Sequence, residues 1–112
     1  MLTEQLPIYR LTYEFVSLLY DYVAGFPRSC RFTIGERMTN EALALFVHIA
    51  RANRSKERRA DELREFCSRM EVLSALLRLV TEKHVITTKQ AARAASVRVA
   101  IGKQVSGWMR SV

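Results

Sequence analysis

Two groups of basic residues are the parts of this sequence best suited to chemistry. One group, between residues 51 and 59, comprises Arg51, Arg54, Lys56, Arg58 and Arg59. The other lies near the C-terminus and comprises Lys89, Arg93, Lys103 and Arg110. Arginine and lysine offer positive charge and several hydrogen-bond donors, which suits contact with the phosphates of a nucleic-acid backbone. We therefore predict that both groups bind nucleic acid; the alternative for either group is a solvated face that keeps the protein soluble.

The distribution of charge supports this prediction. The formal net charge is +7. Residues 1–82 contain twelve Lys and Arg against eleven Asp and Glu, whereas residues 83–112 contain six Lys and Arg and no acid. Such asymmetry on a folded segment is typical of proteins with a polyanionic partner. Base-specific readout is not indicated, because no DNA-reading motif or exposed aromatic platform is visible.

Motifs for catalysis are missing from the sequence. It has no Gly-rich phosphate loop, HExxH, GxSxG, Cys/His cluster or EF-hand loop. The neighbouring carboxylates of Asp61, Glu62 and Glu65 lie among arginines and lack the ExxH pattern of di-metal bundles. His48 would need an organised partner to act as a base. We expect no catalytic residue, no metal and no cofactor, and therefore no enzymatic activity.

Cysteine usage and hydropathy indicate where the protein resides. Cys30 and Cys67 stand alone, so we expect two reduced thiols rather than a zinc site or a disulfide framework. Charged residues interrupt every apolar stretch before it reaches the ~18 residues of a membrane span. The N-terminus lacks a basic start followed by an apolar run. These features predict a soluble, cytoplasmic protein.

The elements that must position these residues are helices. The chain has 112 residues, 49% of them apolar, with only four Gly and two Pro. That length suits one domain, and the scarcity of turn residues favours long helices over a sandwich or barrel. We predict a single domain over residues 1–112, an all-α, antiparallel up-down four-helix bundle with helices at about 7–25, 34–53, 57–82 and 88–110.

Local signals set these boundaries. Pro7 suits a first helical turn, and the segment 24–27, Ala-Gly-Phe-Pro, should end the first helix. Segments 33–36 and 87–90 have the spacing of capping boxes, in which a hydroxyl and a carboxylate or amide satisfy free N–H groups at a helix start.

The middle helices show clear faces. The second helix carries one apolar stripe, Met38, Ala42, Leu45, Ile49 and Ala52, and an opposite stripe, Arg37, Glu41, His48 and Arg51, which we expect to be solvated. The third helix has a bundle seam: Leu63, Phe66, Met70, Leu73, Leu77 and Val80. The pairs Arg58 with Glu62 and Glu65 with Arg69 should be solvated ion pairs.

The first and last helices carry more apolar surface than one monomer core should bury. The first helix has two adjacent seams, one with Ile8, Leu11, Phe15, Leu18 and Tyr22 and the other with Tyr9, Tyr13, Val16, Tyr20 and Val23. In the last helix Arg98 projects from the apolar face and needs a partner, and Trp108 needs cover. We predict an oligomer interface that includes Tyr9, Tyr13, Val16, Tyr20, Arg98 and Trp108.

Several stretches resemble one known family: LPIYRLTYEFVSLLYDYVAGFPRSCRFTIGERM, EALALFVHIARANRSKE, LLRLVTEKHVITTKQ and IGKQVSGWMRS. The most telling are FPR-x-x-RFT-x-G-x-R at residues 26–37 and IG-x-x-x-x-GW at residues 101–108. The sequence is similar to the accessory variability determinant (Avd) family of diversity-generating retroelements. That family is a branch of the four-helix-bundle proteins that include those encoded in ribosomal-RNA intervening sequences.

The resemblance implies a basic, barrel-like homopentamer that associates with a reverse transcriptase and its template RNA during mutagenic cDNA synthesis (mutagenic retrohoming). It implies no catalytic residue. Where intervening-sequence relatives usually have Asn-Ile-Ala-Glu-Gly, residues 48–52 read His-Ile-Ala-Arg-Ala, a change from acid to base that fits the nucleic-acid-binding branch. DNA or an RNA/DNA hybrid is a further possible ligand. The main alternative is a helical oligomeric scaffold that binds only protein partners.

Overall fold

Four long helices account for most of the chain. The computed structural model describes residues 1–112 and contains α1 (Pro7–Ala24), α3 (Glu36–Arg54), α4 (Arg59–Glu82) and α5 (Thr88–Arg110). Shorter helical segments are η1 (Thr3–Gln5), α2 (Arg28–Cys30) and η2 (Arg31–Gly35), the last a π-helical turn. There is no β-strand, so the all-α prediction is confirmed. No helix is both long enough and apolar enough to traverse a membrane.

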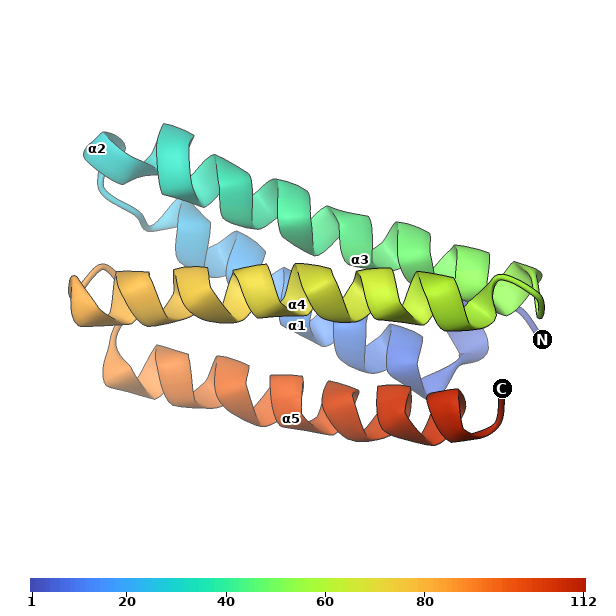
Figure 1. Ribbon diagram of the computed structural model, residues 1–112. Helices are drawn as coiled ribbons and strands as arrows, with labels where there is room; N and C mark the ends of the chain where they lie inside the picture. Colours follow the sequence, from blue (N-terminus) through green and yellow to red (C-terminus); the bar gives the residue numbers. More distant parts are fainter.

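The long helices lie roughly parallel to one axis, and each runs opposite to the one before it (Figure 1). Helix α1 packs against α3 and α5, and α4 packs against the same two helices from the other side. The chain measures 43 × 23 × 21 Å along its principal axes. Two corners matter for function: the α3–α4 connection, at the same end of the bundle as both termini, and the α4–α5 connection at the opposite end (Figure 1).

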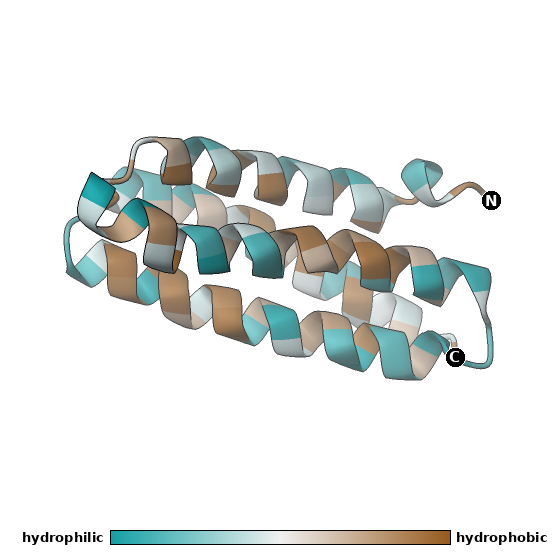
Figure 2. Ribbon diagram, turned by 90° about the horizontal axis from the view of Figure 1, so that it is seen from above, coloured by the Kyte–Doolittle hydropathy of each residue, from teal (hydrophilic) through white to brown (hydrophobic).

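The core forms where the apolar seams of the long helices meet. Every residue of the stripe expected on α3 and of the seam expected on α4 is buried, as are Ala94, Val97, Ile101 and Val105 of α5. Burying the Val, Leu, Ile, Phe and Met side chains of this set stabilises the fold by roughly 1.5–3 kcal/mol each relative to exposure. Figure 2 shows brown apolar segments along the long helices and a teal, hydrophilic α3–α4 connection.

Helix α1 buries a slightly different set than its pattern predicts. The buried residues are Ile8, Thr12, Phe15, Leu19 and Tyr22. Leu11 and Leu18, which were expected in the core seam, are only half-buried. The buried face of α1 is thus rotated toward Thr12 and Leu19 relative to the predicted seam. The helix ends at Ala24, just before Gly25, as predicted.

The start of α3 differs from the expected capping box. Residues 28–35 are already helical, and α3 begins at Glu36 with Gly35 before it and no side-chain cap. The Thr33 hydroxyl donates to the carbonyl of Cys30 instead of capping the helix. The reason is the π-helical turn, which carries the chain into α3 without free N–H groups in need of a cap. A Cβ on Gly35 would lie 2.9 Å from Val23 Cγ1, so this turn sits directly on the end of α1.

The capping box at the start of α5 is present as predicted. The Gln90 N–H donates to Thr87 Oγ1 at 3.0 Å, and the Thr87 N–H donates to Gln90 Oε1 at 2.9 Å. The phenol of Tyr22 donates to the Gln90 carbonyl at 3.0 Å and so ties the end of α1 to this turn. Burial raises the pKa of Tyr22, which keeps its hydroxyl a hydrogen-bond donor at neutral pH.

Candidate nucleic-acid interface

The α3–α4 connection forms a polar hollow of about 420 Å³. We call it the corner hollow and define it by its lining residues: Arg51, Arg54, Ser55, Arg58 and Glu62. Arg51 and Arg54 come from the last turn of α3, and Arg58 directly precedes α4. The structure thus brings three of the five arginines and lysines predicted in this segment around one concave site. Lys56 is exposed outside it.

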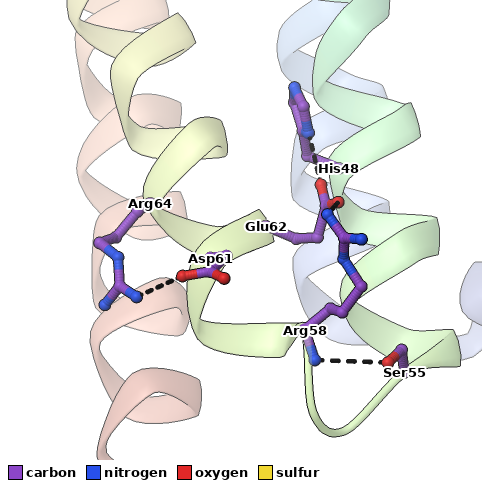
Figure 3. A network of polar contacts seen from close by, with 6 residues as sticks. All are labelled: His48, Ser55, Arg58, Asp61, Glu62 and Arg64. Atoms are coloured by element: carbon purple, nitrogen blue, oxygen red, sulfur yellow. Dashed lines mark hydrogen bonds and ion pairs between the residues drawn. The ribbon is translucent and has the colours of Figure 1, made fainter.

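Glu62 forms the inner side of the corner hollow and joins it to α3. Its Oε2 lies 2.8 Å from His48 Nδ1, and its Oε1 lies 3.9 Å from Arg58 Nη2. Figure 3 shows Glu62 between His48 and Arg58, with Asp61 and Arg64 paired on the other side of α4. The Arg58 N–H also donates to Ser55 Oγ. These contacts hold the Arg58 segment against the end of α3.

The expectation that His48 lies on a solvated stripe was wrong. His48 is 7% exposed and Glu62 is 5% exposed. Both flank the apolar seams through which α3 packs on α4, so close packing draws them inside, where each is the other's partner. Arg58 and Glu62 approach each other as predicted, but the carboxylate is buried rather than solvated.

A second buried acid corrects another predicted pair. Glu41, also expected on the solvated stripe, is 6% exposed and accepts hydrogen bonds from Arg37 and Arg69. Arg69 therefore pairs with Glu41 across the α3–α4 contact, not with Glu65 along its own helix. A buried carboxylate has lost its hydrogen bonds to water and needs donors from the protein, which the facing helix supplies here. A solvated carboxylate keeps its water and has no such need.

Arg59, which was predicted to bind nucleic acid, forms contacts within the protein itself. Its Nε donates to the Ala52 carbonyl at 2.8 Å, and its guanidinium carbon lies 5.2 Å from the centre of the Trp108 ring. It therefore caps the free carbonyls at the end of α3 and covers the tryptophan of α5 by a cation–π contact. Trp108 is half-buried within its own chain by this contact. A guanidinium held in this way has fewer donors left for a phosphate.

The four C-terminal cations lie on the exposed side of α5. Lys89, Arg93, Lys103 and Arg110 are all exposed. Arg93 forms one ion pair, with Glu14 of α1 at 3.5 Å, and the other three form none. Arg98 is half-buried, forms no ion pair, and lines the groove between α4 and α5. The free cations of α5 are thus available to a partner.

An apolar face lies across α1 and α3, away from the core. Tyr13 is 60% exposed and Tyr20 is 69% exposed. Phe46 of α3 packs beside the tyrosines of α1, and its ring centre lies 5.4 Å from that of Tyr9 and 6.2 Å from that of Tyr13. Val16 and Tyr20 join Tyr13 and Phe46 around a shallow depression. The second seam of α1 therefore leaves Tyr13 and Tyr20 on the surface of the single chain, as its surplus of apolar residues led us to expect.

Sequence reasoning missed the contribution of α3 to this apolar face. Leu43 and Val47 are exposed and Phe46 is half-buried. Their spacing of three and four residues beside the core stripe was the available signal, because it widens the apolar arc of α3 beyond what one core needs.

The structure has no group of three or more His, Cys, Asp or Glu side chains that could hold a metal ion. Cys67 lies in the α4–α5 groove, where partial burial, and secondarily the charge of Glu71, raise the pKa of its thiol. A raised pKa leaves little thiolate at neutral pH, so this residue is a poor nucleophile.

Comparison with protein families shows a match over nearly the whole chain. A family model described as bAvd-like matches residues 4–112. That family corresponds to the accessory variability determinants that the sequence resembles. No curated protein matches the chain. The match includes the corner hollow, the basic side of α5 and the apolar face.

The buried contact between His48 and Glu62 can be tested by stability. Glu62→Met leaves a buried imidazole without its partner and should lower the free energy of unfolding by about 1–3 kcal/mol. Adding His48→Leu removes the unpaired group, so the double variant should be more stable than Glu62→Met alone. Chemical denaturation measures both. Asp61→Asn changes a neighbouring residue in an exposed ion pair and should alter stability little. The pairing would be contradicted if the double variant lost as much stability as the single variants Glu62→Met and His48→Leu lose together.

Proposed function

This chain belongs to the bAvd-like family, and we propose that it is a non-catalytic, nucleic-acid-binding accessory protein of a diversity-generating retroelement. Proteins of this family are generally accessory rather than catalytic. The observation that supports nucleic-acid binding is the acid-free C-terminal segment, whose exposed lysines and arginines on α5 include only one with an ion-pair partner. Uncompensated cations on a helix suit contact with a phosphate backbone.

The proposed partners are a reverse transcriptase and its template RNA, with DNA or an RNA/DNA hybrid as further ligands. Binding RNA and enzyme together would raise the effective concentration of one at the other. That role supports mutagenic cDNA synthesis through positioning and needs no reactive group on this chain.

We further propose that the protein works as a homo-oligomer, and in this family a barrel-like pentamer. The support is the apolar face across α1 and α3, on which Tyr13 and Tyr20 are mostly exposed in the single chain. Aromatic surface of this kind is uncommon on a monomer unless it binds a partner. Repetition around a ring would multiply the positive charge presented to nucleic acid.

The alternative function, an oligomeric scaffold that binds only protein, makes a different prediction about salt. Phosphate contacts release counterions, so nucleic-acid affinity falls steeply as salt rises. A mostly apolar protein interface changes little under the same conditions. Salt dependence therefore separates the two functions.

The first prediction concerns assembly. The wild-type protein should be an oligomer by multi-angle light scattering at micromolar concentration. Tyr13→Glu with Tyr20→Glu places charges on the apolar face and should give monomers that keep their helicity, because both side chains are largely exposed in the single chain. Val99→Glu, an exposed apolar position on α5, is the matched control and should remain assembled. A monodisperse wild-type monomer would refute the oligomer.

The second prediction concerns RNA binding. Replacing Lys89, Arg93, Lys103 and Arg110 with Gln should weaken RNA binding and flatten its dependence on salt concentration, because fewer counterions are released. Fluorescence anisotropy across a salt series measures both quantities. Helicity and assembly should be unchanged, since these side chains are exposed. An unchanged affinity with an unchanged salt slope would rule out this side of α5 as the binding site.

The third prediction concerns the accessory role. Template-primed cDNA made by the partner reverse transcriptase from its template RNA should depend on this protein, and this protein alone should incorporate no nucleotide. The four-fold Gln variant should reduce cDNA yield, whereas replacing Arg64 and Arg78, two exposed cations of α4 that are paired with acids, with Gln should not. Equal yield and equal fidelity with and without the protein would refute the accessory role, and incorporation by the protein alone would show it to be an enzyme.

A further inference from the structure

The corner hollow differs from the other basic surface of the protein in being concave and lined only by polar side chains. Arg51, Arg54 and Arg58 surround it, and Ser55 and Glu62 complete its lining. The basic residues of α5, in contrast, lie along one exposed helix. Guanidinium groups that surround one volume can bind a single anion from several sides, which an open stripe cannot do.

Two of the three arginines have no acidic partner. Arg51 and Arg54 form no ion pair, and neither donates a side-chain hydrogen bond within the chain. Arg58 is the only arginine of the hollow near a carboxylate, at 3.9 Å from Glu62. Like charges that line one hollow repel one another, so an anion between them would relieve that repulsion.

The negative charge of Glu62 does not prevent an anion from binding in the corner hollow. It is 5% exposed, and its two oxygens are directed to His48 and Arg58 (Figure 3). Its contact with Arg58 positions that guanidinium at the rim of the hollow. The Ser55 Oγ accepts from the Arg58 N–H, which leaves the serine O–H free to donate to a ligand.

The charge of the hollow selects among phosphate groups. Three guanidinium groups against one carboxylate leave two uncompensated positive charges. A phosphodiester within a nucleic-acid chain carries one negative charge, whereas a terminal phosphate monoester carries about −1.5 to −2 at neutral pH and three acceptor oxygens. The volume of about 420 Å³ accommodates such a group together with several waters, each of which takes ~30 Å³.

We propose that the corner hollow binds a dianionic phosphate monoester, and specifically the 5′-terminal phosphate of a nucleic acid. This rests on the proposed nucleic-acid-binding function, and it assigns the two basic surfaces different roles. The exposed cations of α5 contact the chain of phosphates at any point along it. The corner hollow binds the 5′-terminal phosphate, and it therefore determines the position of the protein along the nucleic acid.

The test compares two short RNAs of one sequence with a fluorophore at the 3′ end, one carrying a 5′-phosphate and the other a 5′-hydroxyl. The wild-type protein should bind the phosphorylated RNA about tenfold more tightly, the effect of a charge-assisted hydrogen bond. Replacing Arg51, Arg54 and Arg58 with Gln should bring the affinity ratio close to one. The single change Arg54→Gln removes no side-chain hydrogen bond or ion pair within the chain and should lower the ratio partway. It keeps the test decisive if the triple variant fails to fold.

The matched control replaces Lys89, Arg93 and Lys103 with Gln and so removes the same number of charges. It should weaken binding of both RNAs and keep the preference for the 5′-phosphate, which separates specific recognition from general attraction. Persistence of the preference after the three corner arginines are replaced would overturn the proposal.

A second readout uses inorganic phosphate, which needs no nucleic-acid binding. Millimolar phosphate should raise the melting temperature of the wild type, relative to chloride at equal ionic strength. It should not raise the melting temperature of the variant in which Arg51, Arg54 and Arg58 are replaced with Gln. A phosphate effect without a preference between the RNAs would overturn the assignment to a nucleic-acid end and would identify free phosphate as the ligand. No preference and no phosphate effect would overturn the proposal. Failure of both RNAs to bind would instead count against the proposed function, and the melting experiment would still test phosphate binding in the corner hollow.

Discussion

The packing of α3 on α4 is the constraint on which the rest of the structure depends. Both helices carry uninterrupted apolar seams, and their contact is the most extensive in the bundle. Because the seams have no gaps, polar residues beside them lose water as the helices close. Glu41, His48 and Glu62 are all buried for this reason. Each needs a partner from the facing helix, since an unpaired polar group in such a place costs about 1–3 kcal/mol.

That requirement explains how charge is divided over the molecule. The buried acids of the α3–α4 contact pair with His48, Arg37, Arg69 and Arg58. Helix α5 contains no acid, and Glu14 of α1 supplies its single ion-pair partner. Two acids, Glu41 and Glu62, therefore serve the α3–α4 contact, whereas the predicted cations of α5 face solvent. The positive surface of α5 reflects the absence of acids from that helix as well as the number of its basic residues.

Features that depend on the spacing of residues within one helix could be predicted from the sequence. Features that depend on how a neighbouring helix packs could not. The seams of α3 and α4 and the capping box at Thr87 follow from spacing alone and are present. Helical spacing also placed His48 opposite the apolar stripe, but the stripe is wide and α4 packs against its edge, so His48 is buried. Arg59 was grouped with the phosphate-binding arginines by proximity in sequence, yet it donates to the Ala52 carbonyl and lies over Trp108. Neither outcome can be read from one helix, because a neighbouring helix decides it.

The arrangement of helices also lets assembly and nucleic-acid binding coexist. The apolar face lies on α1 and α3, whereas the free cations lie on α5, and α3 and α5 occupy opposite positions in the bundle (Figure 1). A second copy seated on the apolar face can cover aromatic side chains without covering the exposed side of α5. The corner hollow lies at the end of α3, beyond Phe46 in the middle of that helix. In the proposed ring, each bundle would use its surplus apolar surface for assembly and would present the basic side of α5 to nucleic acid, so that positive charge is concentrated by repetition of one chain.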